Sequence, residues 1–157
     1  MVETIDFEEC KCIVEYGPGT GIFTNTIINC KKADTKLIIV EKNEFFYSEL
    51  LKKYASNKSV YVVNGGADEI AEYLSFYKVE KVDCIISGLP FTSMPKDISD
   101  KIFIKTKEIL KSKGIFISFQ YTMLMKKTFE KHFSLNKILF EIRNLPPAFV
   151  FVMENNK

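Results

Sequence analysis

The stretch EYGPGTG, residues Glu15–Gly21, places three of the chain's seven glycines within five positions. It follows a short apolar segment, Cys12–Tyr16, that predicts a buried strand, and it precedes Phe23–Cys30, which predicts a helix. Glycines in such a turn let a ligand approach the main chain, and the start of the helix offers unpaired N–H groups. An ordinary tight turn needs only one glycine. The stretch therefore predicts a ligand-binding loop.

The alternation of strand and helix continues along the chain. Short apolar segments predict further parallel strands, and amphipathic segments between them predict helices. The further strands are Leu37–Val40, Val60–Val63, Val82–Ser87 and Gly114–Gln120. The further helices are Phe45–Tyr54, Ala67–Phe76 and Ile98–Lys111. This alternation is typical of a doubly wound α/β sheet with right-handed crossovers.

The pattern changes after Tyr121. A predicted helix, Met123–His132, is followed by two strand-like segments, Lys137–Ile142 and Ala148–Met153, with a short connection between them. Such a connection joins antiparallel strands but not parallel neighbours. We therefore predict a mostly parallel seven-stranded sheet with one antiparallel strand near the C-terminus, in a single domain that spans residues 1–157.

Composition limits the classes of function. The 22 Lys and Arg residues nearly balance the 20 Asp and Glu residues, so the chain lacks the basic field that drives nonspecific binding to nucleic acid. No stretch approaches the roughly 18 consecutive apolar residues of a membrane span, and the acidic, polar start is unlike a secretory signal. We predict a cytoplasmic protein without a nucleic-acid partner.

The cysteines predict no metal site. Cys10, Cys12, Cys30 and Cys84 form no C-x-x-C pair, and His132 is the only histidine of the sequence. Buried, reduced thiols are the expected state of such cysteines.

Residues around the glycines narrow the choice of ligand. A P-loop would need Lys followed by Ser or Thr after the last glycine, whereas this chain has Ile22–Thr24, so a nucleoside triphosphate is excluded. Glu15, just before the turn, would repel a pyrophosphate and attract a cation. Glu41 ends the second predicted strand, where an acid accepts hydrogen bonds from ribose hydroxyls. Asp68 follows the third strand and either accepts an adenine amino group or caps a helix.

These motifs stand in the same order, at the ends of successive predicted strands, as in the class I S-adenosylmethionine-dependent methyltransferases. The chain resembles that class over nearly its whole length. The carrying segments are EYGPGTG, Glu41, GAD at Gly66–Asp68 and SGLPF at Ser87–Phe91. The resemblance implies a Rossmann-like fold, S-adenosylmethionine as cofactor, and Ser87 and Gly88 beside the transferable methyl group. It implies cofactor contacts at Glu15, Gly17, Pro18, Gly19, Thr20, Gly21, Glu41, Lys42, Ala67, Asp68 and Ser87.

Within that class the chain looks most like the bacterial phospholipid N-methyltransferases, which methylate the amine of phosphatidylethanolamine. The segments that carry this likeness are EYGPGTGIFT, Ile86–Pro90, Ser93–Pro95, Phe119–Tyr121 and RNLPPA at Arg143–Ala148. The likeness implies a phospholipid or small amine as substrate, with peripheral membrane contact. Family members usually have covering helices before the first strand; here the short N-terminus leaves that side open to an oligomer partner. The aromatic run Phe45–Tyr47 is expected to bring one ring near a lipid surface.

Substrate-side residues are predicted from their places at strand ends. Tyr121 follows the fifth strand at the carboxyl edge, so we predict that it acts with Ser87 and Gly88 in catalysis, with aromatic packing as the alternative. Leu89 and Pro90 are predicted to contact the substrate. Pro90, Phe91, Met94 and Pro95 form an apolar loop that covers the reacting centre or accepts an acyl chain, with a proline that simply ends the strand as the alternative. Arg143 pairs with a lipid phosphate or is an ordinary surface arginine, and Asn144 orients the headgroup.

Two other functions stay open. The ribosomal RNA adenine dimethylases are more distant relatives by resemblance, but Gly88 stands where their fourth motif has an asparagine, and they carry a C-terminal RNA-binding domain. A chain of that kind would methylate an RNA adenine at N6. A non-catalytic module that keeps the fold and binds a nucleoside or a partner protein is the other alternative.

Overall fold

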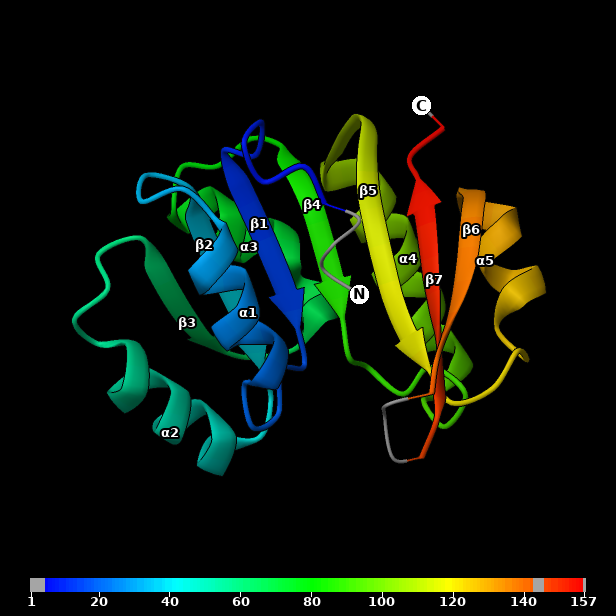
Figure 1. Ribbon diagram of the computed structural model, residues 1–157, viewed down its shortest axis with the longest axis horizontal. Helices are drawn as coiled ribbons and strands as arrows, with labels where there is room; N and C mark the ends of the chain where they lie inside the picture. The colour runs from blue at the N-terminus through cyan, green and yellow to red at the C-terminus, as the bar shows by residue number, and fades with distance from the viewer. Residues whose placement is uncertain (1–4, 143–145, 157) are drawn as a thin grey trace.

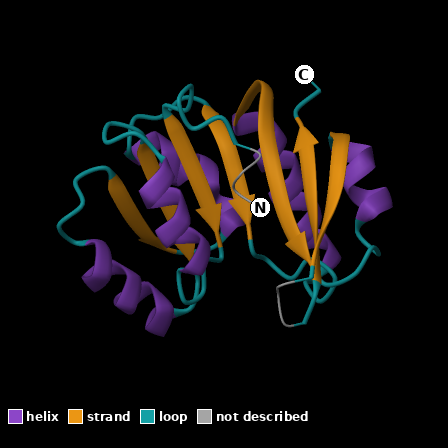
Figure 2. Cartoon of the chain, in the orientation of Figure 1, coloured by secondary structure: helices purple, strands orange, loops and turns teal. Residues whose placement is uncertain are grey.

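The computed structural model describes residues 5–142 and 146–156. Strands and helices alternate along the chain, with a short 3-10 turn (Ala67–Glu69) before the third helix (Figure 2). The strands are β1 (Cys12–Tyr16), β2 (Lys36–Glu41), β3 (Val60–Asn64), β4 (Val82–Ser87), β5 (Leu110–Gln120), β6 (Ser134–Glu141) and β7 (Ala148–Glu154). The helices are α1 (Ile22–Cys30), α2 (Glu44–Tyr54), α3 (Ile70–Phe76), α4 (Lys96–Ile109) and α5 (Lys126–His132).

The strands form one sheet in the order β3-β2-β1-β4-β5-β7-β6. Neighbouring strands are parallel from β3 to β5, whereas β7 is antiparallel to both β5 and β6. Figure 1 shows α1 and α2 on the near face of the sheet and α3, α4 and α5 on the far face. The predicted α/β sheet, doubly wound and with one antiparallel strand, is therefore confirmed.

Aromatic side chains fill the far face. Phe103 of α4, Phe116 of β5 and Phe129 of α5 are all fully buried. The ring centre of Phe129 lies 5.6 Å from that of Phe103 and 6.2 Å from that of Phe116. Buried aromatic rings contribute much of the hydrophobic stabilisation of a small domain. This packing holds α4 and α5 against the strands whose ends form the site described below.

The near face is covered unevenly. Ile27 of α1 and Leu50 of α2 pack over Ile39 of β2. No helix of the described chain lies over the near face of β5, β7 and β6 in Figure 1. Ile5 and Phe7, from the segment before β1, pack against the apolar cluster on this face.

Several predicted boundaries are wrong, among them the start of β6, which lies at Ser134 rather than Lys137. Leu110 and Lys111 belong to β5 rather than to the preceding helix, since α4 ends at Ile109. The side-chain amide of Asn155 donates to the carbonyl oxygens of Leu110 and Lys111, at 3.1 and 3.2 Å, and so satisfies groups at the helix end. Helix α5 begins at Lys126, three residues later than predicted, after a turn.

Three of the cysteines are buried as predicted, whereas Cys30 is exposed at the end of α1. Burial raises the pKa of Cys10 to about 11 and that of Cys12 to about 12, with the charge of Asp83 adding to the effect. These thiols therefore stay protonated at neutral pH.

The topology brings the ends of six strands to one edge of the sheet. Because β6 is antiparallel to β7 and β7 is antiparallel to β5, β6 runs in the same direction as the five parallel strands. The carboxyl ends of all six therefore meet at the lower edge in Figure 1. This carboxyl edge carries the glycine turn after β1, Glu41 at the end of β2, and the segments that follow β4 and β5.

Candidate active site at the carboxyl edge

The glycine turn has a backbone that favours glycine at three positions. Gly17, Gly19 and Gly21 have φ angles of +60°, +56° and +79°. A Cβ at Gly17 would lie 2.7 Å from Cδ2 of Leu89, so the Leu89 side chain would have to move to admit it. At Gly19, by contrast, no atom of the described chain lies within 4 Å of that position. The main chain at Gly19 is therefore open to a ligand.

Glu41 is held in place by the turn itself. Its Oε2 accepts the backbone N–H of Gly19 at 3.1 Å, and its Oε1 accepts the N–H of Asn43 at 2.8 Å. The side chain of Asn43 caps α2 by accepting the N–H of Phe45 at 3.0 Å. Each carboxylate oxygen keeps further capacity to accept a hydrogen bond. Sequence reasoning gave Asn43 no role, although an asparagine before a predicted helix is a signal for a cap.

Glu15 lies beneath the turn, on the face of β1 that α1 covers. Its side chain is 1% exposed, and its Oε2 accepts the hydroxyl of Thr24 at 2.6 Å. Its Oε1 is also buried and has no hydrogen-bond partner in the described part of the chain. Burial raises the pKa of Glu15 to about 7; the Thr24 hydrogen bond opposes this rise and the nearby charge of Glu41 adds to it. Thr24 was not among the predicted site residues.

Asp68 has a partner that the sequence did not predict. Its Oδ2 lies 3.0 Å from the ammonium nitrogen of Lys101 on α4. The alternative of a helix cap is wrong, because Asp68 lies within the 3-10 turn and Glu69 occupies the position before α3. A narrow cavity of about 90 Å³ joins Asp68 to the glycine turn, and its lining includes Gly17, Glu41, Lys42, Gly66, Ala67 and Leu89.

The segment after β4 packs directly against the turn. The N–H of Gly88 donates to the carbonyl of Tyr16 at 2.9 Å, and a Cβ at Gly88 would lie 2.8 Å from the carbonyl oxygen of Gly17. Ser87 is buried, and its hydroxyl accepts the N–H of Leu89 at 3.2 Å. Ser87, Gly88 and Leu89 therefore lie against the glycine turn. The order of the motifs along the sequence places SGLPF and EYGPGTG at the ends of predicted strands.

A buried amide fixes the same segment from the other side. Nε2 of Gln120, the last residue of β5, donates to the carbonyl of Leu89 and to the hydroxyl of Ser118, both at 2.9 Å. Gln120 is 2% exposed, so these bonds are shielded from water. Sequence reasoning assigned no function to Gln120.

The other predicted side chains lie on the rim. Tyr121 is 58% exposed, with its ring centre 5.7 Å from that of Phe119, so it is not a core residue. Pro90, Thr20 and Lys42 are also exposed, and Pro18 is half-buried. Arg143 and Asn144 lie outside the described residues.

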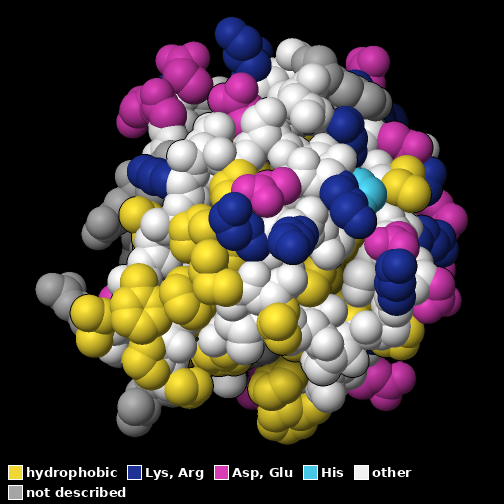
Figure 3. Space-filling model, turned by 90° about the vertical axis from the view of Figure 1, so that its right-hand side faces the viewer, with side chains coloured by type: hydrophobic (Ala, Val, Ile, Leu, Met, Phe, Trp, Pro, Cys, Tyr) yellow, Lys and Arg dark blue, Asp and Glu magenta, His cyan; other side chains and the backbone are white. Residues whose placement is uncertain are grey.

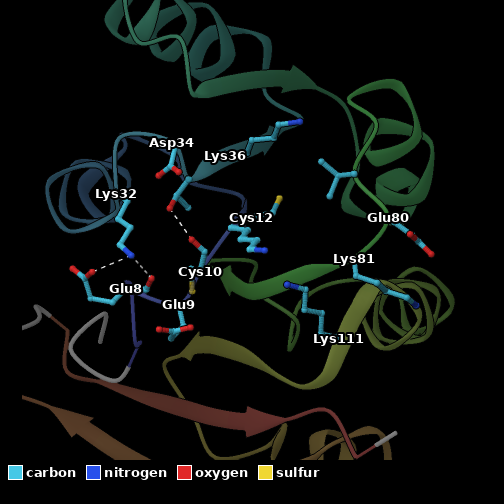
Figure 4. Close-up of a pocket in the computed structure, with 13 residues that line it drawn as sticks. Glu8, Glu9, Cys10, Cys12, Lys32, Asp34, Lys36, Glu80, Lys81 and Lys111 are labelled. Atoms are coloured by element: carbon cyan, nitrogen blue, oxygen red, sulfur yellow. Dashed lines mark hydrogen bonds and ion pairs between the residues drawn. The ribbon is translucent and has the colours of Figure 1, made fainter.

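A further hollow lies at the opposite edge of the sheet. It measures about 870 Å³ and is lined by charged residues near the starts of β1 and β2 (Figure 4). Lys32 pairs there with Glu8 at 3.1 Å, and Lys111 pairs with Asp83. None of the predicted site residues lines it.

The described residues contain no group of three or more His, Cys, Asp or Glu side chains placed to hold a metal ion. In the same part of the chain, none of the helices has the length and apolar character needed to cross a membrane.

Sequence comparison supplies the family. The chain is 30% identical over 148 residues to the ornithine lipid N-methyltransferase of Singulisphaera acidiphila, a match that covers 94% of this chain and 77% of that protein. The chain belongs to this family of S-adenosylmethionine-dependent N-methyltransferases. No family model matches the chain.

Two further proteins are similar to the chain. The ribosomal RNA small subunit methyltransferase A of Hydrogenobaculum sp. is 31% identical over 119 residues, and the match spans 69% of our methyltransferase but only 43% of that protein. The solved structure of the N-methyltransferase NodS from Bradyrhizobium japonicum WM9, with S-adenosyl-L-homocysteine bound, is 9% identical. It has a TM-score of 0.75 and covers 94% of our chain and 79% of NodS, which shows the fold alone.

The cofactor of the methyltransferase is S-adenosylmethionine, and the residues at the carboxyl edge fit this molecule. The open main chain at Gly19 gives it a surface to lie on, and Glu41 offers two fixed oxygens to a diol. The unpartnered Oε1 of Glu15 gives a buried acceptor beneath a ligand that carries positive charge.

Proposed function

We propose that this methyltransferase transfers a methyl group to the primary amine of a lipid headgroup. The observation that carries the proposal is a surface at the carboxyl edge where apolar side chains surround the mouth of the site. The named substrate of the Singulisphaera relative, an ornithine lipid, supports an amine on a lipid as acceptor. Phosphatidylethanolamine also presents a primary amine in its headgroup, although there the amine lies beside a phosphate.

The apolar surface, which we call the rim surface, is built from the ends of several elements. It consists of exposed residues that open α1 and α2, follow β5 or end β6: Ile22, Phe45, Tyr121, Met123, Leu124, Phe140 and Ile142. Figure 3 shows yellow side chains gathered toward the lower part of the molecule, which is the carboxyl edge. A patch of this kind around a site marks a contact with a membrane or another apolar partner.

Charge at the same edge suits a membrane surface. Three exposed lysines lie here: one directly after β2, one at the first residue of α4 and one in the first turn of α5, namely Lys42, Lys96 and Lys127. Lysines near a bilayer are attracted by anionic headgroups, and their long stems lie along apolar surface. Phe45, from the aromatic run, is 69% exposed and belongs to the rim surface.

In this proposal the cofactor lies along the glycine turn. Its ribose binds Glu41, with Gly19 holding that carboxylate, and its adenine lies in the cavity beside Ala67 and Asp68. Pro18, Thr20, Gly21 and Lys42 border the same ligand. When bound, S-adenosylmethionine supplies a methyl group on a positively charged sulfur, which becomes a neutral thioether as the amine forms its new N–C bond.

The protein then has three tasks at the reacting centre. It must align a neutral amine with the methyl group, exclude water, and let the product ammonium lose a proton. Ser87 and Gly88 shape the floor of this centre, and Leu89 and Pro90 cover it. Tyr121 reaches the amine from the rim and relays the proton of the product ammonium to water. Arg143 and Asn144, outside the described residues, follow β6 in sequence and are assigned to the headgroup.

The RNA alternative is not favoured. The Cβ of an asparagine at position 88 would lie 2.8 Å from the carbonyl oxygen of Gly17, so the glycine turn would have to shift to admit the side chain that the RNA adenine dimethylases have in their fourth motif. The balanced charge of the chain gives no added attraction to RNA. A non-catalytic module is not favoured either, because the chain belongs to a family of methyltransferases.

A labelling experiment tests the proposal. The protein is incubated with S-adenosylmethionine labelled on the methyl group and with three vesicle preparations: one with phosphatidylethanolamine, one with an ornithine lipid, and one with phosphatidylcholine alone. Structured RNA is offered in a fourth reaction. Label in either amine lipid and not in phosphatidylcholine is the expected result. Label in RNA alone, or in none of the four, would overturn the proposal.

A further inference from the structure

Glu15 is a buried carboxyl group with one oxygen engaged and one left over. Thr24 donates to its Oε2 at 2.6 Å, whereas Oε1 is shielded from solvent and has no partner in the described part of the chain. The Thr24 hydroxyl lies 3.5 Å from the position that a Cβ would take at Gly21. The Thr24 side chain therefore lies between the Glu15 carboxyl group and the glycine turn.

An unpaired negative charge at this place would be costly. Burial without a positive partner disfavours the ionised form of a carboxyl group, and the native protein avoids the cost by keeping the proton. A protonated Glu15 also gives Oε1 or Oε2 a hydrogen to donate. The balance changes when a cation arrives, because an opposite charge nearby favours the carboxylate.

We infer that Glu15 is protonated in the free methyltransferase and ionised in the cofactor complex, so that binding of S-adenosylmethionine releases a proton from beneath the glycine turn. The inference rests on the cofactor and not on the identity of the methyl acceptor. Glu15 acts as a positioning residue: its carboxylate draws the positively charged part of the ligand onto the turn, and Thr24 holds the carboxylate in orientation.

The described groups that face Glu15 in the free protein do not include a positively charged side chain that would stabilise its carboxylate. Glu41 on β2 is the charged neighbour, and its negative charge favours the protonated form of Glu15. Tyr54 of α2 donates its hydroxyl to Asn25 at 2.8 Å. Cys84 of β4 lies on the same face of the sheet, toward the amino edge, and burial keeps its thiol protonated. In the described part of the chain, no Lys or Arg side chain is among the groups that shift the pKa of Glu15.

Calorimetry measures the released proton directly. S-adenosylmethionine is titrated into the protein at about pH 6 and about pH 8, in two buffers of different ionisation enthalpy, and the difference in heat gives the number of protons exchanged. We expect release of about one proton at the lower pH and much less at the higher pH. The dissociation constant should fall by up to about tenfold as the pH rises by one unit below the midpoint.

Two variants identify the source of the proton. Glu15→Gln, which keeps the shape and the Thr24 contact, should abolish the release and flatten the pH dependence of binding. Glu72→Gln, a change of an exposed acid on α3, should leave both unchanged. Thr24→Val removes a bond that favours the carboxylate and should therefore move the midpoint to higher pH.

The free protein gives a readout that does not need the ligand. Its infrared spectrum near pH 6 should contain a protonated carboxyl band that Glu15→Gln removes. The inference is overturned if this band is absent, if no proton leaves on binding, or if Glu15→Gln releases as many protons as the parent. Because no acceptor is present in these measurements, their failure would be distinct from a failure to methylate lipid.

Discussion

The carbonyl oxygen of Gly17 lies 2.8 Å from the position that a Cβ would occupy at Gly88. The two glycines thus bring the ends of β1 and β4 together, main chain against main chain. Any side chain at position 88 must push the glycine turn away. We expect Gly88→Ala to weaken cofactor binding at least tenfold, which corresponds to a strain of about 1–3 kcal/mol.

Gly114 supplies the matched control for this substitution. A Cβ there would lie 2.9 Å from the carbonyl oxygen of Lys111, a similarly close contact at the amino edge of the sheet. Gly114→Ala should lower the free energy of unfolding yet leave the affinity of the folded protein for S-adenosylmethionine unchanged. Calorimetry and urea unfolding of both variants make the comparison. Equal losses of affinity would contradict the role of Gly88 in shaping the site.

Removal of the Glu41 carboxylate should disrupt the turn as well as the ligand contact. Glu41→Ala leaves the N–H groups of Gly19 and Asn43 without their acceptors. We expect cofactor affinity to fall by one to two orders of magnitude, since an unsatisfied polar group costs about 1–3 kcal/mol. Glu72→Ala, a change of an exposed acid on α3, is the control and should have little effect. Normal affinity in Glu41→Ala would remove Glu41 from the proposed site.

Stability should decrease as pH rises because of Glu15. Its pKa is about 7 in the folded protein and 4.5 for an ordinary glutamate, so between these values the folded state binds more protons than the unfolded state. The contribution of Glu15 is therefore complete below about pH 4.5 and is lost through pH 7, by roughly 3 kcal/mol. Urea unfolding across this range should show a slope that Glu15→Gln lacks. A parent and variant with parallel profiles would show that Glu15 titrates normally.

The rim surface should govern association with vesicles. Leu124 is 78% exposed and Phe140 is 55% exposed at the carboxyl edge, whereas Phe76 is 80% exposed at the end of α3, toward the amino edge. The double variant Leu124→Asp with Phe140→Asp should reduce binding to anionic vesicles at least tenfold, because each inserted side chain contributes about 1.5–3 kcal/mol. Phe76→Asp should bind normally in the same sedimentation assay. Similar losses in both proteins would argue against contact through the rim surface.

Much of the fold follows from local sequence patterns. Strands such as β1 and β2 are short apolar runs bounded by turns, and a short connection before Ala148 requires an antiparallel pair. The boundary between α4 and β5 did not follow, because the bonds from Asn155 to Leu110 and Lys111 join parts of the chain more than forty residues apart. Periodicity carries no information on such long-range contacts.

The candidate site was predictable to the same extent. The glycine turn and Glu41 were apparent because each stands at the end of a strand, and parallel strands end at a common edge. The Lys101 partner of Asp68 was not apparent, since a lysine on an amphipathic helix looks like any other surface charge. Thr24 and Gln120 were missed because buried polar side chains leave no pattern in a sequence.

The reversed direction of β7 allows binding of the methyl donor and binding of the acceptor to depend on different segments of the chain. The connection between Glu141 and Ala148 starts and ends at the carboxyl edge, because these residues pair across β6 and β7. These two strand ends therefore lie at the active-site edge, away from β1 and β2, which carry the glycine turn and Glu41. Changes in this hairpin connection would leave the cofactor loops untouched. A fold of this kind lets acceptor preference diverge between relatives while the methyl donor stays the same.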